Sequence, residues 1–244
     1  MSSYPYKYTA IIIEPRKHKS LELVLMNFVE NLGKEWEFIF YHGTENLDFV
    51  MDIVTRNSIT NIRFVALNTN NLSSLEYSKI LYSREFYKQI FTSFFITFQT
   101  DTFISSKNKD KIYDFLEYDY VGAPWCNIFD CDGKHAVGNG GLSLRRTSKM
   151  VEMIDLYLDS FLNSNSPHIP FEDRFFSNTC GVHFEGLTLK KPAYTIAGDF
   201  STETMLISEN SFGVHKAWHW LSKPDLQRIS ENMPGLDQCV LMNM

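Results

Sequence analysis

Short apolar runs alternate with segments of helical periodicity across residues 8–101, and this alternation limits the possible folds more than any other feature. The runs are rich in β-branched and aromatic residues, as buried strands are, and they cover 8–14, 36–41, 62–67 and 94–101. Between them, apolar residues recur at helical spacing over 21–32, 46–56 and 75–91. The alternation predicts an α/β fold with a mostly parallel central sheet and helices on both of its faces.

The sequence lacks the glycine motifs of two nucleotide-binding classes. No G-x-G-x-x-G follows the first predicted strand, and no G-x-x-x-x-G-K-[ST] occurs anywhere in the chain. A dinucleotide dehydrogenase or a P-loop enzyme is therefore not expected. The formal net charge is −6 and no basic stripe stands out, which argues against a nucleic-acid partner.

The lengths of the apolar runs and the spacing of the cysteines indicate the compartment in which the protein works. No apolar run approaches the about 20 residues of a membrane span, and the first ten residues lack the apolar centre of a signal peptide. We therefore expect no membrane span and a cytoplasmic location. The four cysteines do not have zinc-site spacing, and although Cys126 and Cys131 are close in sequence, reduced thiols are expected rather than a disulfide.

The second half of the chain changes character. A glycine-rich turn that feeds a strand is expected within 137–146, because three glycines in four positions precede alternating leucines. The polar C-terminal stretch carries Pro224 and Pro234, so we expect the last twenty residues to wrap the surface. Helical segments are expected at 111–115, 148–162 and from 170–178.

The fourth predicted strand ends in an aspartate. The run FFITFQTD places Asp101 where the strand leaves the core, and ligands of open α/β sheets bind at the carboxyl ends of strands. Asp101 is thus a candidate for holding a metal or a phosphate-bearing substrate. The alternative is that Asp101 only caps the next turn, and the strand by itself does not decide between the two.

Six further segments stand out in order along the chain: IIIEPRKH at 11–18, FQTD at 98–101, YDYVGAPW at 118–125, VGNGGLSLRR at 137–146, EDRFFS at 172–177 and FGVHKAW at 212–218. Together they resemble the landmarks of a known family, an uncharacterised domain family placed among the GT-A glycosyltransferases, with members in bacteria, fungi and giant viruses. The resemblance covers nearly the whole chain. Because the family has members in giant viruses, the expected cytoplasmic location includes the cytoplasm of a host cell in which a virus-encoded protein is made. It implies a single GT-A-like domain over 1–224, with a nucleotide-binding half at 1–104, an acceptor and catalytic half at 105–224, and a C-terminal tail at 225–244.

This resemblance implies sugar transfer from a nucleotide diphosphate sugar, with a UDP-sugar as donor and a glycan or other hydroxyl as acceptor. The leaving diphosphate is negatively charged, and Mn²⁺ or Mg²⁺ would neutralise it. The implied metal ligands are Asp101 and His215. GT-A proteins usually carry D-x-D at this strand end, whereas this chain has Gln99-Thr100-Asp101, so one acid is replaced by an amide.

We expect inverting rather than retaining transfer, and inverting transfer needs a general base for the acceptor hydroxyl, which retaining transfer does not. The acidic pair Glu172 and Asp173 resembles the pair that serves inverting GT-A enzymes, with Asp173 the preferred base; ordinary first-turn acids of a helix are the alternative. Aromatic residues Tyr118, Tyr120 and Trp125 are candidates for stacking on an acceptor sugar. Donor contacts are implied for Glu14, Pro15, Arg16, Gln99, Thr100, Asp101, Asn139, Gly140, Gly141 and Lys216.

Two other functions compete with the transferase. The missing first acid of Gln99-Thr100-Asp101 favours a non-catalytic nucleotide- or carbohydrate-binding protein with a degraded GT-A site. A hydrolase that uses a metal and a phosphate on a similar sheet is disfavoured, because no acidic cluster lies near the N-terminus. The sequence indicates neither the sugar nor the oligomeric state.

Overall fold

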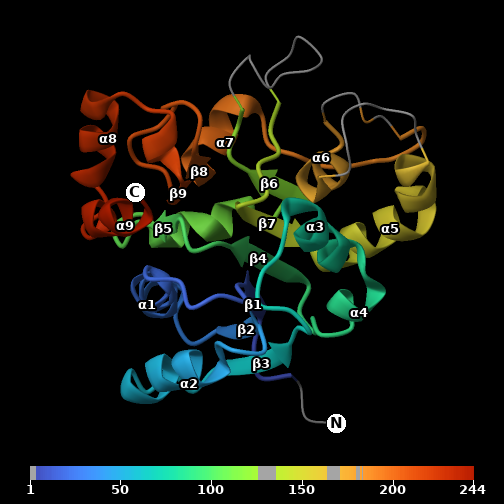
Figure 1. The fold of residues 1–244 in the computed structure, drawn as a ribbon. Coiled ribbons are helices and arrows are strands. Elements are labelled where there is room, and N and C mark those ends of the chain that lie inside the picture. Colours follow the sequence, from blue (N-terminus) through green and yellow to red (C-terminus); the bar gives the residue numbers. More distant parts are fainter. Residues whose placement is uncertain (1–3, 126–135, 164–170, 180–181, 183) are drawn as a thin grey trace.

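A six-stranded sheet forms the centre of the protein (Figure 1). The structure is a computed structural model, and it describes residues 4–125, 136–163, 171–179, 182 and 184–244. The strand order is β3-β2-β1-β4-β7-β6, in which β1 to β4 run parallel and β7 and β6 are each antiparallel to their neighbour. The mostly parallel α/β sheet is thus confirmed. The strands are β1 (Tyr8–Ile13), β2 (Trp36–His42), β3 (Ile62–Ala66), β4 (Phe94–Phe98), β6 (Tyr120–Gly122) and β7 (Leu142–Arg146).

Helices cover both faces of this sheet because the central strands are apolar on both sides. In β1, Ala10 and Ile12 pack into one core, and Ile11 and Ile13 into the other. The first core also contains residues of α1 (Leu21–Leu32), α2 (Leu47–Arg56), α7 (Tyr194–Phe200), α8 (Lys223–Ser230) and α9 (Leu236–Asn243). The second contains residues of α3 (Ser74–Tyr82), α4 (Arg84–Tyr87), α5 (Thr147–Leu162) and α6 (Glu172–Ser177).

A second, three-stranded sheet has the order β5-β9-β8. It consists of β5 (Thr102–Ile104), β9 (Gly213–His215) and β8 (Ser201–Thr202), with β5 antiparallel and β8 parallel to β9. The register pairs Thr102 with His215, so the residues that follow β4 lie beside the end of β9. Of two 3₁₀ helices, η1 (Lys109–Phe115) follows β5 in the chain and η2 (Ala217–His219) follows β9.

The helix predicted over 75–91 is two helices. Ser83 adopts an extended conformation, and its hydroxyl caps α4 by accepting the backbone N–H of Glu85. A serine competes well with helix continuation because its side chain can bond to the neighbouring backbone. The prediction of one continuous helix was therefore wrong at this residue.

The last twenty residues also differ from the expectation that they wrap the surface as a polar tail. Within 225–244, α8 and α9 insert apolar side chains into the main core, among them Ile229, Leu236 and Val240. The α9 residue Asn243 donates a hydrogen bond to the backbone oxygen of Thr100, 3.1 Å away. The α9 helix thus packs against and supports the segment that follows β4.

The cysteine prediction is tested at one position. Cys239 is a buried free thiol that packs beside β5, whereas Cys126, Cys131 and Cys180 lie outside the described residues. Within the described part of the chain, no helix combines the length and apolar character that a bilayer crossing requires.

Candidate active site

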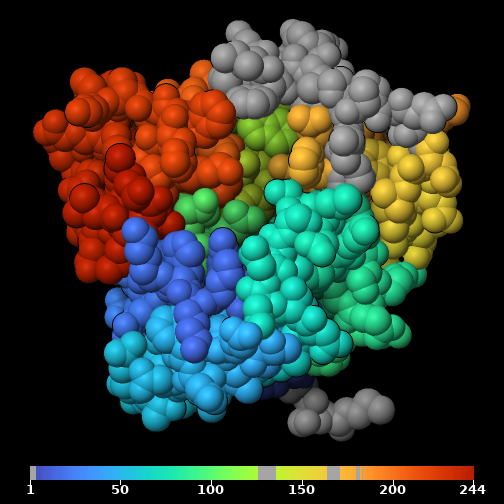
Figure 2. Space-filling model, viewed as in Figure 1, coloured from blue at the N-terminus to red at the C-terminus, as the bar shows by residue number. Residues whose placement is uncertain are grey.

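A cavity of about 410 Å³ lies at the edge of the central sheet where the parallel strands end. Ile12 of β1 pairs with Phe98 of β4, and Phe98 pairs with Leu142 at the start of β7. The residues after β1, after β4 and before β7 therefore meet at one edge. The chain passes from β1 to β2 and β3 on one side and returns to β4 on the other, so this is the switch point where α/β sheets bind ligands. Figure 2 shows the surface hollowed between blue N-terminal residues, cyan α3 and the orange-red C-terminal residues.

All of the predicted catalytic, donor-contact and metal-ligand residues line this cavity. They come from five separate stretches of the chain and are Glu14, Pro15, Arg16, Gln99, Thr100, Asp101, Asn139, Gly140, Gly141, Glu172, Asp173, His215 and Lys216. Their individual roles stay predictions, but their convergence means that one ligand can touch all of these stretches.

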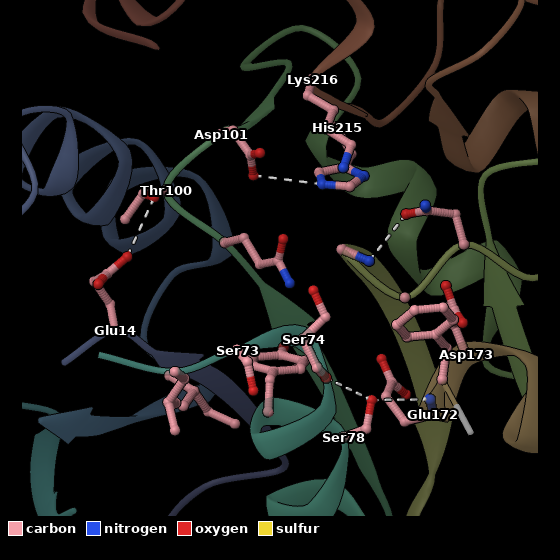
Figure 3. Close-up of a pocket in the computed structure, with 18 of the residues that line it drawn as sticks. Glu14, Ser73, Ser74, Ser78, Thr100, Asp101, Glu172, Asp173, His215 and Lys216 are labelled. Atoms are coloured by element: carbon pink, nitrogen blue, oxygen red, sulfur yellow. Dashed lines mark hydrogen bonds and ion pairs between the residues drawn. The ribbon is translucent and has the colours of Figure 1, made fainter. Parts of the chain in front are cut away.

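Asp101 and His215 face each other across one end of the cavity (Figure 3). The Oδ1 atom of Asp101 lies 3.4 Å from Nε2 of His215, and Nδ1 of His215 lies 3.2 Å from Oε1 of Glu203 on the far side. Burial favours the neutral imidazole, but the two carboxylates outweigh it and raise the pKa of His215 to about 9. Burial likewise opposes ionisation of Asp101, yet the charge of His215 prevails and lowers the pKa of Asp101 to about 2.

The Asp101–His215 pair fits a divalent cation in its donor chemistry. Neither Oδ1 of Asp101 nor Nε2 of His215 has a hydrogen-bond partner among the described residues, although both atoms are buried. A carboxylate oxygen and an imidazole nitrogen are suitable ligands for Mn²⁺. In the described residues, however, no three or more His, Cys, Asp or Glu side chains form a group that could hold a metal by themselves. Other ligands would have to come from substrate or water.

The two neighbouring acids at the start of α6 have different surroundings. Glu172 is buried and its Oε2 lies 2.7 Å from Nη1 of Arg145, a fully buried guanidinium that lies over the rings of Tyr120 and Phe176. In the described residues, no Arg or Lys side chain pairs with Asp173, whose Oδ1 accepts the backbone N–H of Arg174 at 2.8 Å. Burial, and then the negative charge of Glu172, raise the pKa of Asp173 to about 7. The geometry therefore leaves Asp173 free to exchange a proton near neutral pH, whereas Glu172 is occupied by Arg145.

Two glycines are required by the side chains of the site. A Cβ atom at Gly140 would lie 2.3 Å from Oε1 of Glu172, and one at Gly141 would lie 2.2 Å from Cε1 of His215. The backbone N–H of Gly141 also donates to Oδ1 of Asn139 at 2.9 Å, which fixes the turn. In the structure, the missing side chains make room for Glu172 and His215, and donor contact by this turn stays a prediction.

A bidentate ion pair forms the opposite side of the cavity. Arg16 donates through Nε and Nη2 to the two carboxylate oxygens of Glu14, each at 2.8 Å. Glu14 is buried, while the side chain of Arg16 is about half exposed. The carboxylate thus holds a cationic group at the cavity mouth. Near the Asp101 end, Lys216 has a left-handed backbone (φ 33°) and its N–H donates to the backbone oxygen of Asp101 at 2.8 Å.

The start of α3 supplies a wall that the sequence analysis did not include. Ser73 caps this helix in a capping box with Glu76, and Ser74, Tyr77 and Ser78 also line the cavity. Ser78 accepts a hydrogen bond from the backbone N–H of Glu172 at 3.2 Å, which joins α3 to α6. Only the packing of α3 shows that its N-cap residue Ser73 faces the site (Figure 3).

The aromatic residues suggested for acceptor stacking do not line this cavity. Tyr120 is fully buried beneath Arg145, and its hydroxyl donates to the backbone oxygen of Gly138 at 2.7 Å. Trp125 is also buried, and Tyr118 lies next to Lys190. Tyr120 supports Arg145, and Trp125 and Tyr118 contribute to packing.

Comparison with known proteins relates the fold to glycosyltransferases. The family described as "Protein of unknown function (DUF5672)" matches residues 61–215. A search of curated proteins finds no match. Among solved structures, the chain is similar to the apo form of the glycosyltransferase GlyE from Streptococcus pneumoniae TIGR4, with a TM-score of 0.54 and 9% identity, over 97% of this chain and 62% of that one.

Weaker likenesses involve TarS 1–349 from S. aureus. For TarS 1–349 the TM-score is 0.46 at 16% identity, over 70% of this chain and 54% of that one. For the complex of TarS 1–349 with UDP-GlcNAc the TM-score is 0.44 at 14% identity, over 70% of this chain and 52% of that one. The chain thus spans less than two thirds of the length of each of these three structures. The protein therefore has a GT-A-like α/β fold, as expected from the sequence.

Proposed function

The chain belongs to the DUF5672 family, and we propose that it is a glycosyltransferase that moves a sugar from a nucleotide diphosphate sugar, with a UDP-sugar as donor, to a hydroxyl of a glycan or other acceptor. The observation that carries the proposal is the presence of two chemical centres in one cavity. Asp101 and His215 form one, and Asp173, with a pKa of about 7, forms the other. A transfer with a charged leaving group needs both a cationic site for that group and a base for the incoming hydroxyl.

Asp173 is the proposed general base. A base works best when its pKa is close to the working pH, because it then combines ionisation with useful proton affinity. In this role Asp173 takes the acceptor hydroxyl's proton as the oxygen attacks the anomeric carbon, and the configuration inverts. Glu172 acts through Asp173 rather than on substrate: its carboxylate, fixed by Arg145, contributes the charge that keeps the pKa of Asp173 high.

Asp101 and His215 are the proposed protein ligands of Mn²⁺ or Mg²⁺. Such ions commonly use one or two protein groups and complete their coordination with substrate phosphates and water. The cation would neutralise charge on the leaving diphosphate. Without a cation, the same two residues form an ion pair with a protonated imidazole, so the cation would replace that proton.

The rest of the cavity supports the donor. Glu14, Pro15 and Arg16 follow β1, where the nucleotide is proposed to lie, and Arg16 offers an exposed guanidinium at the mouth for a phosphate. Lys216 adds a second cationic group beside Asp101. Hydrogen-bonding groups for the sugar come from Asn139 and from the turn that contains Gly140 and Gly141.

The proposal is tested by donor hydrolysis and sugar transfer over a panel of nucleotide sugars, with and without Mn²⁺. We expect cation-stimulated release of UDP from one donor. Asp101→Asn should remove the stimulation, and Asp173→Asn should abolish transfer while UDP affinity persists. The matched control is Asp48→Asn, an exposed carboxylate on α2.

One alternative has a specific observation in its favour. Gln99 replaces an acid, and among the described residues no three or more His, Cys, Asp or Glu side chains form a group that could hold a metal; both features favour a non-catalytic binding protein. Binding of UDP without hydrolysis or transfer for any donor would select that alternative. Absence of both binding and turnover would reject a nucleotide site altogether.

A further inference from the structure

The small sheet places three ionisable side chains in one row. Asp101 immediately precedes β5, His215 ends β9, and Glu203 directly follows β8. The register pairs Thr102 with His215 and Thr202 with Val214, so Asp101 and Glu203 lie on opposite sides of His215. Nothing in the sequence spacing suggests this, because the three residues come from distant segments.

Glu203 contacts the imidazole nitrogen that points away from the cavity. Its Oε1 lies 3.2 Å from Nδ1 of His215, while Nε2 faces Asp101. Both Glu203 and His215 are almost fully buried, at 4% and 2% exposure, so bulk water does not replace this contact. A neutral imidazole has one N–H and one lone pair, and the partner of one nitrogen decides which atom carries the proton.

Glycine at 141 holds the ring from a second side. A Cβ atom there would fall within 2.5 Å of Nδ1, Cε1 and Nε2 of His215, so the ring packs directly against the glycine backbone. The imidazole is thus confined between Gly141 and the carboxylate of Glu203. This restricts its rotation and leaves Nε2 directed at Asp101.

We propose that Glu203 is a positioning residue of the cation site: it accepts the Nδ1 proton of His215 and thereby presents the Nε2 lone pair to the cation shared with Asp101. This inference rests on the proposed function, since it assumes that Asp101 and His215 bind a cation. Carboxylates behind metal-binding histidines orient the ring and increase its basicity. The second negative charge also offsets a divalent cation in a buried setting, where unbalanced charge is costly.

The test measures Mn²⁺ binding by the full chain, by electron paramagnetic resonance and by calorimetry, with and without UDP. We expect Glu203→Ala to weaken Mn²⁺ binding by about 10- to 100-fold. The amide oxygen in Glu203→Gln can still accept the Nδ1 proton, so this variant should retain most of the affinity. Glu209→Gln, in the exposed segment after β8, is the matched control. UDP affinity without a cation should be the same in all variants.

A second readout is independent of turnover and of binding strength. With Mg²⁺ and UDP bound, nitrogen NMR of labelled protein should show His215 protonated only at Nδ1, and Glu203→Ala should give a mixture of tautomers. A purely structural role for Glu203 would not change this signature. If the alanine variant does not fold, Glu203→Met, which has similar volume and no acceptor, replaces it in both measurements.

Two results overturn the inference, and they are distinguishable. If Asp101→Asn and His215→Ala abolish Mn²⁺ binding but Glu203→Ala or Glu203→Met binds as the wild type does, the role of Glu203 is wrong and the cation site stands. If the wild-type chain binds no Mn²⁺ even with UDP, the cation site is wrong and the role of Glu203 falls with it.

Discussion

Replacement of Asp173 by asparagine should change activity and stability in opposite directions. The carboxylate is held in a cavity beside the negative charge of Glu172, and burial and that charge raise its pKa from 3.8 to about 7. Asparagine has nearly the same shape but cannot take a proton. We expect Asp173→Asn to lose about 10²- to 10⁴-fold in kcat, the usual contribution of a general base.

The same substitution should stabilise the fold at neutral and higher pH. Because the folded-state pKa lies above the unfolded value, the native state holds the Asp173 proton more tightly. That stabilisation is complete below about pH 4 and is lost as the pH rises through 7. A displacement of about three pKa units corresponds to at most about 4 kcal/mol, and partial solvent access reduces this, so we expect Asp173→Asn to gain about 2 kcal/mol at pH 8.

Two assays measure the ionisation of Asp173. Urea unfolding of both proteins at several pH values should give a stability difference that is small near pH 4, grows towards pH 7 and is constant above pH 7. The kcat/KM of the wild type should rise about tenfold per pH unit below 7 and then level. The control is Asp48→Asn, which should show neither change.

A stability difference that does not vary with pH would refute the assigned ionisation of Asp173. A wild-type pH profile that is flat between 5 and 8, or substantial transfer by Asp173→Asn, would refute its role as base. The two results are independent, so the perturbed carboxylate and its catalytic use are tested separately.

Three further predictions concern the framework of the site. Gly141→Ala forces a Cβ atom against the ring of His215, so Mn²⁺ affinity should fall at least tenfold. The free energy of unfolding, measured by thermal unfolding, should fall by about 1–3 kcal/mol. Unchanged Mn²⁺ binding would show that the ring can move. Arg145→Met leaves the buried charge of Glu172 unpaired and should lower the free energy of unfolding in urea by about 3–5 kcal/mol. The double variant Arg145→Met/Glu172→Gln should recover part of this loss. A double variant no more stable than Arg145→Met alone would contradict the pairing. Leu236→Ala should cost about 2–5 kcal/mol in the same assay if α9 is part of the core, whereas a loss below 0.5 kcal/mol would favour a surface tail.

Local sequence patterns were sufficient to predict the central sheet and two of the stretches that line the cavity, but not the wall that α3 supplies. Parallel strands end at one edge, so polar residues that follow apolar runs, such as Glu14 and Asp101, must gather there once the strands are recognised. The other stretches, including Gly140, Asp173 and His215, were indicated by resemblance of motifs to a family, and they line the same cavity. Strand identity depends on local patterns of apolar side chains, which a sequence displays directly.

Only the tertiary structure decided what each of these residues contacts. The partner of Glu172 is Arg145, the partner of His215 is Glu203, and the support behind Thr100 is α9, and each pair is distant in sequence. Sequence patterns describe periodicity along one element, whereas these contacts depend on how separate elements pack and on which charges become buried together. For that reason the sequence located the acids of the site, and the packing separated a proton-exchanging Asp173 from a paired Glu172.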